Sequence, residues 1–96
     1  MRVEKLDAEE IAGRMKSLGE WTVSGDSLQR TLRFKDFVQA MAFVNRVAGI
    51  AEANRHHPDI LVRYNKVTLV LSTHDAGGIT SKDFELAKAL EAAIAA

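Results

Sequence analysis

Three histidines within a 19-residue stretch are the side chains of this sequence best suited to chemistry near neutral pH. His56 and His57 are adjacent in NRHHPDI, directly before Pro58, the only proline, and His74 follows in STHD. An imidazole can donate or accept a proton at this pH, so such a set can supply general acids and bases. The same residues could instead bind a metal or occupy turns.

The spacing of the histidines disfavours a metal site. Zinc needs three or four ligands, and two adjacent histidines with a distant third match no usual ligand spacing. The chain has no cysteine that could complete such a set, so we expect no metal. A structural role stays open, because histidine near a helix C-terminus interacts favourably with the helix dipole and His-Pro suits a turn. Spacing alone therefore does not choose between this role and proton transfer.

Five segments of regular structure are expected to position these residues. The pattern predicts helices over 7–18 and from Asp36 to just before Pro58, a hairpin over 21–34, a second hairpin over 59–73 that turns at Asn65–Lys66, and a last helix from Thr80. Nine apolar residues, from Phe37 to Ala51, fill one half of the second helix, which marks it as the main core helix. His56 and His57 then lie at the exit of that helix, and His74 closes the fourth strand.

The order of these segments predicts the fold class. Two hairpins that alternate with helices suit an α+β sandwich, a four-stranded antiparallel sheet with three helices on one face, in the order α-β-β-α-β-β-α. Residues 1–96 are expected to form a single domain, since this length suits one modest core.

Composition narrows the classes of partner. Lys plus Arg equals Asp plus Glu, 13 against 13, so charge favours neither direct nucleic-acid binding nor an anionic membrane. The first ten residues, MRVEKLDAEE, are charged and contain no apolar segment, so we expect neither a signal peptide nor a membrane span. These features predict a cytoplasmic protein.

An ordered set of residues makes the chain similar to a known family. The set consists of Glu52, then after three residues His56-His57-Pro58, then an aromatic at Tyr64, then His74 in THD, and finally Asp83. With FKDF at 34–37 and YNKV in register, roughly residues 20 to 90 resemble the pterin-4a-carbinolamine dehydratases.

The resemblance implies a small-molecule pterin substrate and no cofactor. The substrate class is 4a-hydroxytetrahydropterin, the carbinolamine left after aromatic amino acid hydroxylases use tetrahydrobiopterin, and loss of water yields a quinonoid dihydropterin. Hydroxide is a poor leaving group, so an acid should protonate it while a base takes the N5 proton. By resemblance, His56 and His74 are candidates for the acid, and His57 binds the pterin and assists as base.

Three further residues of the set are expected to bind substrate or to support the histidines. Glu52 precedes His56 by one helical turn, so the two side chains can meet, and a carboxylate there would favour a protonated, oriented ring. Asp83 stands at a capping position of the last helix and is expected to be mainly structural. Tyr64 could touch the pterin ring, although an aromatic in a strand is more often part of the core.

Two residues depart from the family pattern. Arg55 stands where relatives usually carry Asp or Asn, and Ile60 stands where many have Trp. A cation beside His56 can reorganise its hydrogen bonds, and the smaller Ile60 removes one stacking contact. Neither change removes a proton-transfer group, so both are expected to affect substrate fit and rate.

The chain is expected to form a homodimer or homotetramer. Val38, Ala42 and Ala53 add apolar surface on the far side of the main helix, and a four-stranded sheet leaves two unpaired edges. Members of the resembled family also form dimers and tetramers.

A second reading is a non-catalytic protein-binding module on the same scaffold. Vertebrate members of the family also act as dimerisation cofactors of a homeodomain transcription factor, and some relatives assist assembly of other proteins. A pure binder would be free to lose the histidines, so the complete set of His56, His57 and His74 favours the enzyme.

Overall fold

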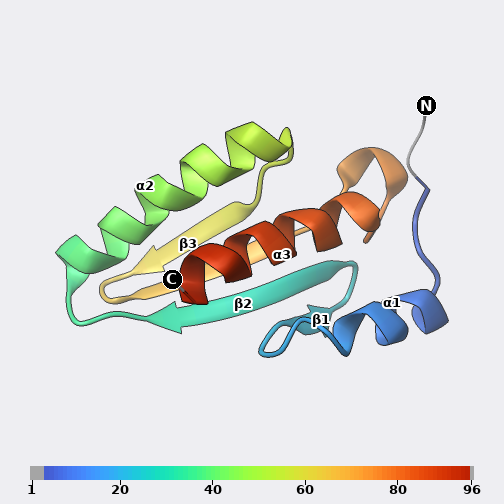
Figure 1. Cartoon of the computed structure of the whole chain (residues 1–96), viewed down its shortest axis with the longest axis horizontal. Coiled ribbons are helices and arrows are strands. Elements are labelled where there is room, and N and C mark those ends of the chain that lie inside the picture. Colours follow the sequence, from blue (N-terminus) through green and yellow to red (C-terminus); the bar gives the residue numbers. More distant parts are fainter. Residues whose placement is uncertain (1–3, 96) are drawn as a thin grey trace.

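Three helices and four strands follow one another in the predicted order (Figure 1). The computed structural model describes residues 4–95. Its elements are α1 (Ala8–Met15), β1 (Thr22–Ser24), β2 (Ser27–Arg33), α2 (Phe37–Asn54), β3 (Asp59–Arg63), β4 (Lys66–Leu71), the short 3-10 helix η1 (His74–Ala76) and α3 (Ser81–Ala95). The predicted α+β class is confirmed.

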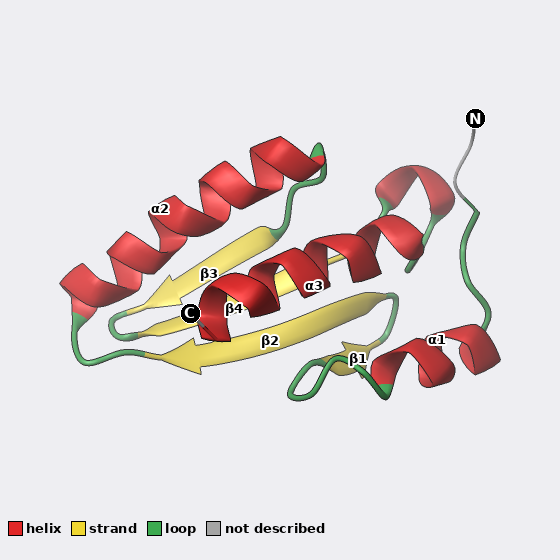
Figure 2. Ribbon diagram, in the orientation of Figure 1, coloured by secondary structure: helices red, strands yellow, loops and turns green. Residues whose placement is uncertain are grey.

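The four strands form one antiparallel sheet in the order β1-β2-β4-β3. Figure 2 shows α2 and α3 running across the same face of this sheet, with α1 at the β1 end. Ile11 and Met15 of α1 pack against the same core as the other helices. Among residues 4–95, no helix covers the opposite face of the sheet.

The core lies between the sheet and the helices. Strand β4 supplies Val67, Leu69 and Leu71, which are fully buried because alternate residues of a strand point to one face. On the uncovered face, the hydroxyl groups of Thr31 and Thr68 lie 2.9 Å apart and share a hydrogen bond. Strand β4 therefore turns one face to the core and the other away from it.

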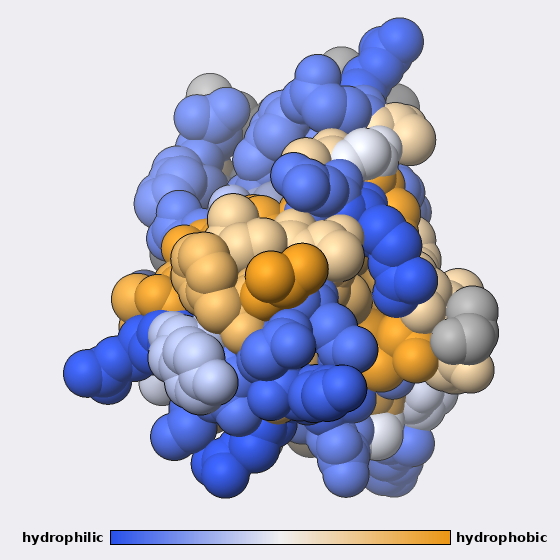
Figure 3. All heavy atoms as spheres, turned by 90° about the vertical axis from the view of Figure 1, so that its left-hand side faces the viewer, coloured by the Kyte–Doolittle hydropathy of each residue, from blue (hydrophilic) through white to orange (hydrophobic). Residues whose placement is uncertain are grey.

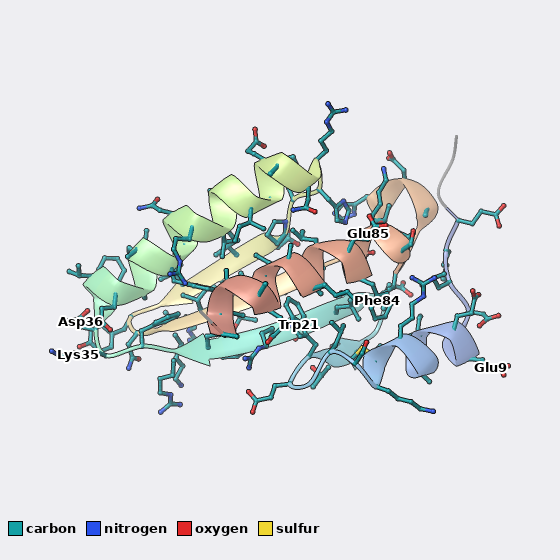
Figure 4. The ribbon with its side chains drawn as sticks, in the orientation of Figure 1. Glu9, Trp21, Lys35, Asp36, Phe84 and Glu85 are labelled. Atoms are coloured by element: carbon teal, nitrogen blue, oxygen red, sulfur yellow. The ribbon has the colours of Figure 1, made fainter. Side chains whose placement is uncertain are left out.

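A part-buried polar cluster ties α3 to the sheet beside this core. Glu91 of α3 accepts hydrogen bonds of 2.8 Å from the Trp21 indole and from the Arg30 guanidinium of β2. Phe84, labelled in Figure 4, lies between α3 and α1, and the Arg14 guanidinium is 5.7 Å from its ring centre. These contacts fix α3, whose first turn carries part of the candidate site.

The predicted helix starts are confirmed by their caps. Asp7 forms a capping box with Glu10, and the Asp36 carboxylate accepts a 2.9 Å hydrogen bond from the Gln39 backbone. At the start of α3, the Thr80 hydroxyl accepts a hydrogen bond from the Lys82 backbone. The first helix ends at Met15, earlier than the predicted end at residue 18, and the chain continues from there as turns.

The main helix is less buried than its apolar half predicts. Four of its residues are buried, namely Ala40, Phe43, Val47 and Ala51. Phe37 and Ala48, which belong to the apolar half that was expected in the core, are exposed. Figure 3 shows apolar side chains gathered on the face that includes the start of α2, surrounded by hydrophilic ones.

The turn of the second hairpin lies one residue earlier than predicted, at Tyr64–Asn65. The register pairs Arg63 with Lys66, and Asn65 is tied to β2 by a 2.9 Å hydrogen bond from its side-chain amide to the Phe34 carbonyl. Tyr64 therefore takes the left-handed position of the turn, with φ of 51°. Within residues 4–95, none of the helices has the length and apolar character needed to cross a membrane.

Candidate active site

The second hairpin brings the three histidines to one end of the sheet. Asp59 pairs with Val70, so the start of β3 lies beside the end of β4. His56 and His57 directly precede β3, and His74 begins η1 directly after β4. Residues far apart in the sequence thus come together because both strands of a hairpin present their outer ends at the same edge.

The end of α2 sets the direction of the two adjacent histidines. Arg55 is left-handed, with φ of 53°, and its N–H donates to the Glu52 carbonyl, while the His56 N–H donates to the Ala51 carbonyl, both at 3.2 Å. These two bonds form a Schellman motif, which usually places glycine at the left-handed position. The chain therefore leaves the helical path at Arg55.

This reversal corrects the expected partner of Glu52. A continued helix would place the Glu52 carboxylate beside His56, but the structure pairs it with His57 Nε2 instead. Both members of this pair are exposed, with 64% of the His57 side chain and 76% of the Glu52 side chain accessible. A pair in that setting is largely screened by water. Glu52 thus contacts the second histidine of the doublet and not the first.

His56 turns inward and meets a buried carboxylate. Its Nε2 lies 2.6 Å from Asp83 Oδ1, and Asp83 is fully buried in the first turn of α3, whereas 13% of the His56 side chain is accessible. A buried charge is tolerated only when hydrogen bonds or a counter-charge satisfy it. Asp83 is thus both the predicted capping residue of α3 and the partner of a site histidine.

The second oxygen of Asp83 is satisfied by two threonines. Oδ2 accepts a 2.9 Å hydrogen bond from the Thr73 hydroxyl and a 2.8 Å hydrogen bond from the Thr80 backbone N–H. The two threonine hydroxyls are themselves 2.8 Å apart. Across residues 4–95, every buried side-chain nitrogen or oxygen has a hydrogen-bond partner. The carboxylate is therefore rigidly held.

A hollow of about 310 Å³ opens beside these groups. It is lined by Arg55, His56, His57, Ser72, Thr73, His74, Asp75 and Lys82. Three imidazoles, two cations and a carboxylate surround a space that suits a small polar molecule. The arrangement can donate and accept protons on a bound ligand.

The structure does not bring Tyr64 to this hollow. Tyr64 lies at the opposite end of the hairpin, about one five-residue strand away, or roughly 17 Å at 3.3–3.4 Å per residue. Its side chain is 67% exposed, so it also does not belong to the core of this chain. The predicted contact of Tyr64 with a ligand in the histidine hollow is therefore not supported by where Tyr64 lies in the folded chain.

Sequence reasoning missed Thr73. The signal was present, because Thr73 continues the inward series of Val67, Leu69 and Leu71 at the end of β4. A hydroxyl at an inward position must find a buried partner, which predicts a polar network behind His74.

Within residues 4–95, no group of three or more His, Asp and Glu side chains is arranged to hold a metal ion.

A family model described as Pterin 4 alpha carbinolamine dehydratase matches residues 4–93. The chain belongs to the pterin-4a-carbinolamine dehydratase family. This membership confirms the resemblance noted in the sequence.

Relatives from this family cover nearly the whole chain. A protein of Gloeobacter violaceus named "Putative pterin-4-alpha-carbinolamine dehydratase 2" is 53% identical over 92 residues, which is 92% of this chain and 100% of the relative. A Thermomicrobium roseum protein of the same family name is 55% identical over 86 residues, 90% of this chain and 92% of the relative.

Solved structures show the same fold. A transcriptional coactivator/pterin dehydratase from Brucella melitensis superimposes with a TM-score of 0.85 at 33% identity, covering 93% of this chain and 97% of that protein. A pterin dehydratase-like protein identified as a RuBisCO assembly factor in the alpha-carboxysome gives 0.59 at 20% identity, covering 75% and 83%, and shares the fold alone.

The hydrogen bonds of Asp83 predict its contribution to stability. Asp83→Ala leaves three donors without an acceptor, so it should lower the free energy of unfolding by about 3–5 kcal/mol, measured by denaturant titration. Asp36→Ala removes a capping carboxylate with one backbone partner and should cost about 1 kcal/mol. Equal costs for the two variants would contradict the network.

Proposed function

We propose that the chain is a hydro-lyase that dehydrates 4a-hydroxytetrahydropterin to quinonoid dihydropterin, in the recycling of tetrahydrobiopterin. The observation that carries the proposal is the meeting of three histidines around one hollow, with one of them held by a buried carboxylate. Family membership supplies the substrate class. The cytoplasmic location expected from the sequence stays a prediction.

The proposed reaction needs two coupled proton transfers. An acid gives a proton to the 4a-hydroxyl, the C4a–O bond breaks, and its electron pair leaves with water. The N5–H proton passes to a base, and its electron pair forms the C4a=N5 double bond. Histidine suits both roles, since an imidazole is chemically able to donate or to accept a proton near neutral pH.

The different surroundings of the histidines support a division of these roles. We assign His56 and His74 as the candidate acids and His57 as the pterin-binding residue that assists as base. His57 carries an exposed carboxylate partner, Glu52, whose hydrogen bond to Nε2 can orient the ring. All three line the same hollow, so one ligand can reach them together.

A second candidate is a protein-binding role on the same scaffold. The observation that favours it is the apolar surface at the start of α2, where Phe37 is 50% and Val38 is 76% exposed (Figure 3). Exposed apolar patches bounded by polar residues often mark contacts with other proteins. This surface lies away from the histidine hollow, so the two roles can coexist.

Replacement of each histidine tests the enzymatic proposal. His56→Ala, His57→Ala and His74→Ala should each reduce the dehydration rate of freshly generated 4a-hydroxytetrahydropterin by about 10² to 10⁴ fold, because each removes a positioned proton-transfer group. Stopped-flow absorbance measures the rate, and circular dichroism checks the fold. Lys16→Ala, in the turn after α1, is the control and should keep the wild-type rate. Wild-type rates in all three histidine variants would refute the assignment.

Metal removal separates proton transfer by histidine from metal catalysis. Protein treated with a chelator and freed of metal should dehydrate the same substrate at the untreated rate, since the proposed step uses imidazoles alone. The metal content of the sample is measured by mass spectrometry. Activity that disappears on chelation and returns with zinc would overturn the metal-free mechanism.

We also propose that the chain assembles as a homodimer through the outer edge of β3, which is an edge strand of the sheet. A homotetramer would then form from two such dimers through contacts between their α2 helices. Pairing about a two-fold axis at Leu61 would place Asp59 opposite Arg63 of the partner subunit, twice per dimer. Leu61 is 53% exposed on this edge, and such pairing would cover it. Opposite charges directly across strands favour this register.

Charge exchange on β3 tests the proposed dimer. Wild-type protein in light scattering after size exclusion should have at least twice the mass of the 10.6 kDa chain. Asp59→Arg or Arg63→Asp alone places like charges opposite each other and should shift the equilibrium toward monomer, whereas the double variant should restore assembly. A lone 10.6 kDa wild-type species would contradict the proposal.

A further inference from the structure

Thr73 is a buried polar residue to which the proposed reaction assigns no role. It follows β4 and directly precedes His74, and its backbone N–H donates a 2.9 Å hydrogen bond to the Gly78 carbonyl. Its side chain points to the interior and contacts both Asp83 and Thr80. It thus links the segment that carries His74 to the carboxylate that holds His56.

The hydrogen bonds around Thr73 have one consistent direction. The Thr73 hydroxyl has a single proton, and it donates this proton to Asp83 Oδ2. The contact between the two threonines must then use the proton of Thr80, with Thr73 as acceptor. The Thr80 oxygen in turn accepts from the Lys82 backbone N–H at 3.2 Å. Each donor in this series of hydrogen bonds therefore has a defined acceptor.

This order leaves one oxygen of Asp83 for His56. Oδ2 already accepts from the Thr73 hydroxyl and the Thr80 N–H, so Oδ1 faces the ring nitrogen Nε2. A carboxylic acid ordinarily loses its proton more readily than an imidazolium, so the shared proton resides on the ring.

We propose that Thr73 is a positioning residue that acts through Asp83 to hold neutral His56 as the Nε2–H tautomer, so that Nδ1 is the nitrogen that exchanges a proton with the ligand. Within residues 4–95, the His56 ring has a hydrogen bond only through Nε2. Every buried polar side-chain atom there has a partner, so Nδ1 is not fully buried, and His56 lines the hollow. Only the ligand part of this proposal rests on the proposed function. The tautomer rests on the contacts alone.

Nitrogen NMR of the wild-type protein without ligand tests the tautomer. Long-range ¹H–¹⁵N correlation, at a pH where His56 is neutral, should show a protonated Nε2 and an unprotonated Nδ1. The ring is assigned by its absence in His56→Ala. A protonated Nδ1 in the neutral ring would overturn the proposal, whether or not the protein dehydrates pterins. The correct tautomer in a protein without dehydratase activity would instead refute only the proposed function.

Variants of Thr73 test the positioning role. Thr73→Val keeps the shape but removes the hydroxyl, and it should mix the His56 tautomers and lower the turnover number about 10- to 100-fold, as expected when a reacting group is misplaced. Thr73→Ser keeps the hydroxyl and should preserve the tautomer and most of the rate. Thr31→Val removes a matched threonine–threonine hydrogen bond on the uncovered face of the sheet and should change neither.

The outcomes separate a positioning role from a merely structural one. Thr73→Val with the wild-type tautomer and turnover would overturn the role of Thr73. If Thr73→Val does not fold, Thr73→Ser and the wild-type spectrum decide, and a changed tautomer in Thr73→Ser would also overturn it. Mixed His56 tautomers and a lowered turnover number in Thr73→Val, with both restored in Thr73→Ser, would support the positioning role.

Discussion

The burial of one carboxylate constrains both the fold and the site of this protein. Asp83 is fully inaccessible, and a charge in that position must have its hydrogen bonds satisfied. Its partners come from three separate segments, namely His56 after α2, Thr73 after β4 and Thr80 at the start of α3. The same contacts cap a helix and orient a histidine, so loss of the carboxylate should affect stability and chemistry together.

The surrounding fold brings the hydrogen-bond partners of Asp83 together. The antiparallel hairpin places the end of α2 and the end of β4 at one edge, and the left-handed Arg55 turns His56 away from the helical path. As a result, the adjacent histidines have opposite surroundings, one held by a buried aspartate and one beside an exposed glutamate. Neighbours in sequence can thus be given different chemical roles.

The sequence predicted the elements and the histidine cluster but not their partners. Helix starts such as Asp36 and the strands of the second hairpin depend on local sequence pattern, so they could be predicted. Helical spacing suggested that Glu52 meets His56, and this was wrong because the helix ends in a Schellman motif with arginine in place of the usual glycine. The inward orientation of Thr73 could have been predicted from the alternation of the strand. Its contact with Asp83 could not, because that contact depends on the packing of α3.

A double-mutant cycle tests whether Asp83 acts on the proposed reaction through His56. Dehydration rates are measured for the wild type, Asp83→Asn, His56→Ala and the double variant. If Asp83 acts through His56, Asp83→Asn should lower the rate of the wild type but have little further effect once His56 is absent. An equal fold-reduction in both backgrounds would show instead that Asp83 acts independently of His56.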